Sequence, residues 1–237
     1  PLYSSAASDV YKRQRWARSP QHQHAVAIVE HPSAGQPPLT WSYLQLQTAA
    51  DQLSLQLLKA GVKKGDRVAI VMPQRFETAV SYMAVLQMGA VAMPLSMLFG
   101  PDALAFRVDD SGAAVALCDE TSAPILQSLK KECRGLKTIV NVPQELINSN
   151  TKSSAKGLVK GRIKPTPSEV FKPVITHADD PAILIYTSGT TGNPKGALIP
   201  QRALIGNLTG FICSQNWFGF EPSQSALSQD KNSLPTG

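Results

Sequence analysis

The sequence has 237 residues, of which 43% are hydrophobic and 17% charged, and its formal net charge is +6. A chain of this length and composition can bury the core of one or two domains, which excludes a wholly disordered protein. No apolar run reaches the length of a membrane span, and the first residues lack the apolar region of a secretory signal. The positive charge suits an anionic ligand but does not establish nucleic-acid binding, since most basic residues are dispersed.

The first predicted elements are two short strands and a helix. Residues 25–29 form an apolar run typical of a strand, and 40–41 belong to another short strand. A helix then begins at Ser42, because Ser42 with Gln45 three residues later is a capping-box pattern. Apolar residues continue at helical spacing until Gly61, which ends the helix. This helix presents a packing face, and we expect no site on it.

Strands and helices then alternate, which predicts an α/β fold with a parallel sheet and helices on both of its faces. The predicted strands lie at 67–72, 90–94, 113–118 and 138–142, and the predicted helices run from Phe76 to Leu86, over 102–110 and over 124–133. Asp109 and Asp110 are sequential neighbours near a helix end and point in different directions, so we assign them no paired acid–base role.

Three segments do not have the pattern of a folded core. Residues 1–14 resemble translated adapter sequence, and we expect a non-native or disordered leader there. Residues 148–164 are rich in lysine, serine and glycine without interleaved aromatic residues, which favours a solvated linker over a polyanion-binding patch. Residues 221–237 are polar and aperiodic, and we expect a disordered or foreign tail. The folded part is therefore predicted to span 15–220.

The cysteines and histidines do not predict a metal site. Cys118, Cys133 and Cys213 are odd in number and widely spaced, so they form neither a metal-binding pattern nor an obvious disulfide framework. Reduced thiols in a cytoplasmic protein are the expectation. His22 and His24 are separated by one residue but have no further ligand cluster, which favours an exposed polar segment.

The most informative part of the chain is the run Tyr186–Gly196, which has the composition of a phosphate-cradling loop. Its glycines let the backbone turn tightly and approach a ligand closely. Its hydroxyl groups and one lysine add donors and a positive charge, and clustered backbone N–H groups form a concave anion site. The glycines are Gly189, Gly192 and Gly196, and the side-chain donors are Ser188, Thr190, Thr191 and Lys195.

The flanks of this run predict its structural context. Residues 181–186 are apolar and indicate a buried strand that ends at the loop. After a short link, a helix is expected to start at Pro200, since proline is favoured in a first helical turn. The run is not the usual P-loop, because Pro194 precedes Lys195 and no Ser or Thr follows the lysine.

Thr187–Gly196 resembles the phosphate-binding signature of the AMP-forming adenylate synthetases, which include acyl-CoA synthetases, luciferases and peptide-synthetase adenylation domains. The resemblance covers roughly 25–220, and Ser96–Leu104 points to the acyl-CoA synthetase branch. Other segments that resemble family motifs are Leu39–Leu44, Gly61–Ile70 and Leu86–Leu95.

The resemblance implies a two-step reaction. A carboxylic (fatty) acid attacks ATP to give an acyl-adenylate and pyrophosphate, and the thiol of coenzyme A then displaces AMP. ATP, Mg²⁺ and coenzyme A are the implied small molecules, with no nucleic-acid partner. The residues implied to contact or neutralise the β- and γ-phosphates are Thr187, Ser188, Gly189, Thr190, Thr191, Gly192 and Lys195.

Several family motifs are not found after the loop: the adenine-contacting segment with its metal-binding glutamate, the ribose-binding aspartate, and the small C-terminal domain with its catalytic lysine. Gln201 also stands where many relatives have a histidine. We therefore expect an N-terminal fragment of an acyl-CoA synthetase that is inactive alone. The alternatives are an adenylation domain that loads a carrier protein and a non-catalytic nucleotide-binding or interaction module.

Overall fold

A computed structural model describes residues 16–32, 35–142, 170–187 and 193–206 of the chain. The predicted leader, linker and tail lie outside these residues. The centre of the structure is a six-stranded sheet with the strand order β6-β5-β3-β4-β7-β8. Its strands are β3 (Arg67–Val71), β4 (Val91–Pro94), β5 (Val115–Cys118), β6 (Thr138–Asn141), β7 (Pro181–Thr187) and β8 (Lys195–Pro200). The first five strands in this order run parallel, and β8 runs antiparallel to β7.

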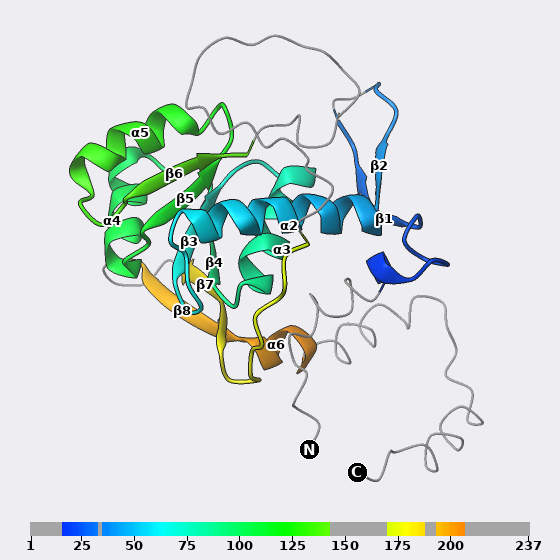
Figure 1. Cartoon of the computed structure of the whole chain (residues 1–237). Coiled ribbons are helices and arrows are strands. Elements are labelled where there is room, and N and C mark those ends of the chain that lie inside the picture. Colours follow the sequence, from blue (N-terminus) through cyan, green and yellow to red (C-terminus); the bar gives the residue numbers. More distant parts are fainter. Residues whose placement is uncertain (1–15, 33–34, 143–169, 188–192, 207–237) are drawn as a thin grey trace.

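Helices cover both faces of the sheet (Figure 1). The helices α2 (Tyr43–Lys59) and α3 (Phe76–Gln87) pack on one face, and α4 (Pro101–Ser111) and α5 (Ala123–Glu132) pack on the other. The chain steps from β3 to β4 in one direction and then returns past β3 to β5 and β6. Because such crossovers are right-handed, the two directions place their helices on opposite faces.

Alternate residues of the central strand serve the two cores. Val68 and Ile70 of β3 pack with α2 and α3, whereas Ala69 and Val71 pack with α4 and α5. This is the two-residue period of a strand, and all four side chains are buried. The structure therefore confirms the predicted α/β fold class and the sandwiched, mainly parallel sheet.

A separate antiparallel pair, β1 (Val26–Glu30) and β2 (Leu39–Ser42), lies beside α2 and α3 (Figure 1). Trp41 stacks on Phe76 with ring centroids 4.4 Å apart, which fixes the pair to the start of α3. The capping box predicted at Ser42 is present: the Gln45 amide donates to Ser42 Oγ, and the Ser42 amide donates to Gln45 Oε1.

The region after the phosphate run corrects the sequence prediction. Lys195–Pro200 is a strand rather than a short link, so the sheet is mixed. The predicted helix is present as α6 (Gln201–Gly206), which follows Pro200 directly. Pairing with β7 stabilises this strand, and a local pattern of three apolar residues does not reveal such a partner. The strand β7 is also less buried than predicted, with Ile185 39% exposed.

We predict that Ser42→Ala lowers the free energy of unfolding by about 1 kcal/mol, because it removes the side-chain acceptor for the first turn of α2. Denaturant unfolding checks this value. Ser128→Ala is the matched control, since that hydroxyl only donates to a carbonyl within α5 and its loss should change stability little. Equal effects of the two substitutions would contradict the role of the cap.

Candidate phosphate-binding site

The predicted phosphate loop joins two paired strands. Thr187 ends β7 and Lys195 begins β8, and the two residues are cross-strand partners. Their exposed side chains stand at the mouth of the hairpin, where Thr187 Oγ1 lies 3.5 Å from the Lys195 carbonyl oxygen. The structure thus brings together two of the seven predicted residues. The other five, Ser188, Gly189, Thr190, Thr191 and Gly192, lie outside the described residues.

The hairpin mouth lies at the carboxyl edge of the sheet. Because β7 runs parallel to β4, Thr187 points out of the same edge as Pro94, Val71 and Cys118, the last residues of β4, β3 and β5. Ligands of open α/β sheets bind at this edge. Lys195 forms no ion pair with the described residues, so its charge is available to an anion there.

Gln201, which stands where the resemblance implies a histidine, is buried at the start of α6. Only 3% of its surface is exposed, and its backbone N–H donates to the Asp180 carbonyl at 2.9 Å. Its side-chain Nε2 has no hydrogen-bond partner among the described residues. Gln201 therefore packs at the opposite end of β8 from Lys195, away from the phosphate loop.

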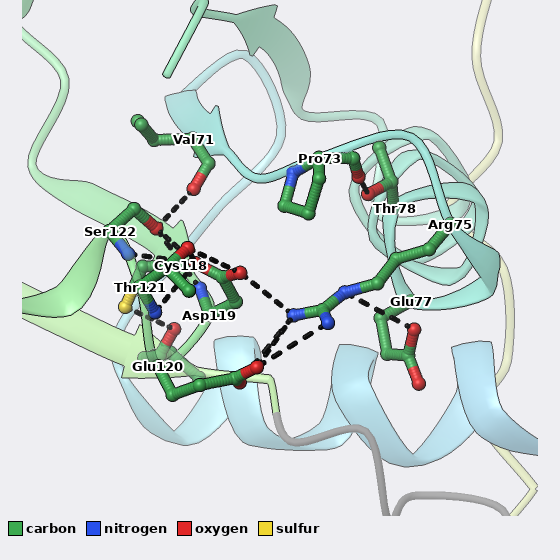
Figure 2. A network of polar contacts seen from close by, with 11 residues as sticks. Val71, Pro73, Arg75, Glu77, Thr78, Cys118, Asp119, Glu120, Thr121 and Ser122 are labelled. Carbon is green, nitrogen blue, oxygen red and sulfur yellow. Dashed lines mark hydrogen bonds and ion pairs between the residues drawn. The ribbon is translucent and has the colours of Figure 1, made fainter. Parts of the chain in front are cut away.

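A second polar cluster, the Arg75 network, joins the carboxyl ends of β3 and β5 (Figure 2). The Arg75 guanidinium lies 2.8 Å from Asp119 Oδ2, 3.4 Å from Glu120 Oε1 and 3.6 Å from Glu77 Oε2. Asp119 and Glu77 are buried, whereas Glu120 is exposed. Arg75 thus holds the turn before α3 against the turn after β5, across 44 residues of sequence.

The two buried carboxyls of this network have opposite pKa shifts. Burial alone would raise the pKa of Asp119, but hydrogen bonds donated by Ser122 and Thr121, together with the Arg75 charge, outweigh burial and lower it. Burial dominates at Glu77 and raises its pKa, despite the nearby Arg75. Because Arg75 bridges turns that follow two different strands and its side chain is only 13% exposed, we interpret the network as structural.

Sequence reasoning missed the Arg75 network because its members follow different strands and share no local motif.

The cysteines agree with the expectation of reduced thiols. Cys118 and Cys133 are free and buried, while Cys213 lies outside the described residues. Burial raises the pKa of Cys118 to about 12, which makes it a poor nucleophile. Within the described part of the chain, no three His, Cys, Asp or Glu side chains gather as a metal site.

A hollow of about 740 Å³ lies between β1, the start of α2 and α3. Apolar side chains line most of it, with Glu30, His31 and Arg75 among its polar residues. Arg75 is already engaged by carboxylates, and Glu30 accepts a hydrogen bond from the Phe76 amide at 3.1 Å. The hollow thus presents one cation that is paired with protein carboxylates and one carboxylate held by a backbone amide, and this pair does not identify a ligand. Apart from this hollow, the length of the helices bears on whether one could span a membrane. None of the described helices is long and apolar enough to cross a membrane.

We predict that Arg75→Ala destabilises the fold by about 3 kcal/mol, because it leaves the buried Asp119 carboxylate without its cation. Thermal or denaturant unfolding measures the loss. Arg202→Ala is the control, since Arg202 pairs with Asp179 on the surface and such pairs contribute about 1 kcal/mol or less. A loss for Arg75→Ala as small as that of the control would show that the network does not stabilise the fold.

We also predict that the stability difference between the wild type and Asp119→Asn depends on pH. Because folding lowers the pKa of Asp119, its stabilising effect is complete above the unfolded value of about 4 and is lost as pH falls through the folded value. Unfolding measured from neutral to acidic pH should show the two proteins converging in acid. A difference that is constant over this range would contradict the assignment.

Comparisons with known proteins identify the family of the chain. The chain matches the family model described as AMP-binding enzyme over residues 13–230. It is 30% identical over 196 residues to a linear gramicidin synthase of Brevibacillus parabrevis, a match that covers 83% of this chain and 3% of that protein. It is 29% identical over 188 residues to the long-chain-fatty-acid–CoA ligase FadD13 of Mycobacterium tuberculosis, covering 78% of this chain and 33% of that ligase.

The fold has solved counterparts as well. The crystal structure of the anthranilate CoA ligase AuaEII in complex with anthranoyl-AMP is similar to 87% of this chain and 36% of that ligase, with a TM-score of 0.66 and 21% sequence identity. The chain therefore spans about a third or less of the length of these relatives. Since the family model matches most of its residues, the chain belongs to the AMP-binding, adenylate-forming enzymes.

Proposed function

We propose that this chain supplies the part of an ATP-dependent acid–thiol ligase that holds the β- and γ-phosphates of ATP. The observation that carries the proposal is the β7–β8 hairpin, which sets Lys195 beside Thr187 at the carboxyl edge of the sheet. The remaining proposed contacts come from Ser188, Gly189, Thr190, Thr191 and Gly192, within the loop that the hairpin closes.

The chemistry requires neutralisation of the phosphate charge. A carboxylate oxygen attacks the α-phosphorus of ATP, the bond to the β-phosphate oxygen breaks, and pyrophosphate leaves with the electron pair. The Lys195 ammonium and the hydroxyl and N–H donors of the loop would stabilise the charge on the leaving group. The family implies Mg²⁺ as well, but the described residues offer no ligand set for it, so we assign it no step.

The thiol that accepts the acyl group is proposed to be coenzyme A, and the acid a fatty acid. FadD13 is named as a long-chain-fatty-acid–CoA ligase, and AuaEII as an anthranilate CoA ligase, which supports a CoA acceptor. A carrier-protein acceptor is the second candidate, because the chain is equally similar to the linear gramicidin synthase. Because acyl transfer needs the whole ligase, measuring transfer by the complete enzyme to free coenzyme A and to a phosphopantetheine-bearing carrier separates the two.

The chain spans about a third of such ligases, so we propose that it binds phosphate weakly and forms no thioester unaided. Incubation of the purified chain with ATP, Mg²⁺, a fatty acid and coenzyme A tests this. The expected result is no acyl-CoA above background. Acyl-CoA that accumulates in proportion to the amount of this chain would contradict the proposal.

We predict that Lys195→Ala weakens the binding of pyrophosphate by about tenfold or more, because a charge-assisted contact is worth about 1.5–3 kcal/mol. Calorimetric titration at low ionic strength measures the affinity, and added salt should narrow the difference. Lys137→Ala is the matched control, since Lys137 is an exposed lysine that precedes β6, the edge strand farthest from β8 in the sheet. Equal affinities for wild type and Lys195→Ala would remove Lys195 from the site.

A further inference from the structure

One side chain ties the loop end of the β7–β8 hairpin to a helix. Tyr186, the residue before Thr187 on β7, donates its phenol hydrogen to the Asp110 carboxylate at 2.6 Å. Asp110 lies in the last turn of α4, 76 residues earlier in the chain. A short bond to a carboxylate is among the stronger hydrogen bonds in a protein, so it links β7 to α4 directly.

Tyr186 also rests on the opposite strand of the hairpin. Its cross-strand partner is Gly196, the second residue of β8. A Cβ atom at Gly196 would lie 3.4 Å from Tyr186 Cζ and 3.0 Å from Leu184 Cδ1. A methyl group at Gly196 would crowd the tip of Leu184, whereas its distance to the tyrosine ring would be an ordinary contact. The ring therefore lies beside Gly196 across the hairpin.

A buried cation contacts the same ring. The Arg107 guanidinium carbon lies 5.7 Å from the centroid of Tyr186 and 4.1 Å from that of Phe99. Arg107 is one turn before Asp110 on α4, is 8% exposed, and donates through Nη1 to the Ala103 carbonyl. The phenol and the ring face thus both interact with α4, which restricts the tyrosine in two directions.

We propose that Tyr186 is the positioning residue of the phosphate site. Its hydrogen bond to Asp110 and its packing beside Gly196 hold Thr187 and Lys195, at the loop end of the β7–β8 hairpin, in place. Successive side chains of a strand point to opposite faces. Tyr186 can therefore contact α4 while the exposed side chain of Thr187, its neighbour, points to the opposite face. The ligand in this inference rests on the proposed function, but the fixing of the hairpin does not.

The test uses the whole chain and two conservative variants, Tyr186→Phe and Asp110→Asn. Tyr186→Phe keeps the ring on Gly196 and removes only the donor, and Asp110→Asn keeps the shape of the acceptor. Hydrogen–deuterium exchange is read at the amides of β7 and β8, and inorganic pyrophosphate is titrated in parallel. We expect faster exchange confined to the hairpin and a five- to tenfold weaker affinity, because a net hydrogen bond is worth about 1 kcal/mol.

Two further variants separate positioning from general destabilisation. Tyr186→Phe and Asp110→Asn remove the two partners of one hydrogen bond, so the double variant should be little worse than either single one. Tyr82→Phe is the control, because it removes a phenol of α3 that has no hydrogen bond in the described structure. It should leave exchange in β7 and β8 unchanged.

The outcomes distinguish this inference from the proposed function. Unchanged exchange of β7 and β8 in both Tyr186→Phe and Asp110→Asn would overturn the positioning role, and so would acceleration spread evenly over β3 and β5. Wild-type pyrophosphate affinity in both variants would also overturn it. If the wild-type chain does not bind pyrophosphate, the proposed function fails for this chain, while the exchange data still decide whether Tyr186 fixes the hairpin.

Discussion

The site depends on the double pairing of β7. In one direction β7 aligns parallel to β4, with Ala92 opposite Ile183, and in the other it pairs antiparallel with β8. The first pairing sets the depth of the loop at the carboxyl edge of the sheet, and the second closes the loop between Thr187 and Lys195. A shift of one residue in either pairing would turn the side chains of β7 to the wrong face.

Much of the fold could be predicted because the signals are local. The capping box at Ser42, the helical spacing after Phe76 and the alternation of apolar strands with helices each lie within a short window, and the structure has an element at each. These signals also predicted helices on both faces of the sheet, since right-handed crossovers leave few other arrangements.

The contacts that sequence reasoning missed are the ones made across the chain. The strand β8 depends on its partner β7, Arg75 meets Asp119 across 44 residues, and Tyr186 meets Asp110 across 76. In the sequence, Asp110 stands out only as the neighbour of Asp109, and that pairing indicates no role. For the site itself, the sequence places Thr187 and Lys195 in one loop, and the structure adds that they face each other across a hairpin.

The two polar clusters at the carboxyl edge differ in what their charges already contact. Arg75 is surrounded by protein carboxylates, which makes it part of the frame. Lys195 is exposed and forms no ion pair with a described residue, and it borders the glycine-rich loop. This difference, more than the number of charges, indicates that the end of the edge at β7 and β8 suits an anionic ligand better than the end at β3 and β5.

The central claim is that the hairpin holds the outer phosphates of ATP rather than the nucleoside. The most direct measurement is a competition titration of the chain with ATP, inorganic pyrophosphate and AMP. We expect pyrophosphate to displace ATP from one site and AMP to compete far more weakly. Displacement of ATP by AMP as readily as by pyrophosphate would contradict it, as would failure of pyrophosphate to bind.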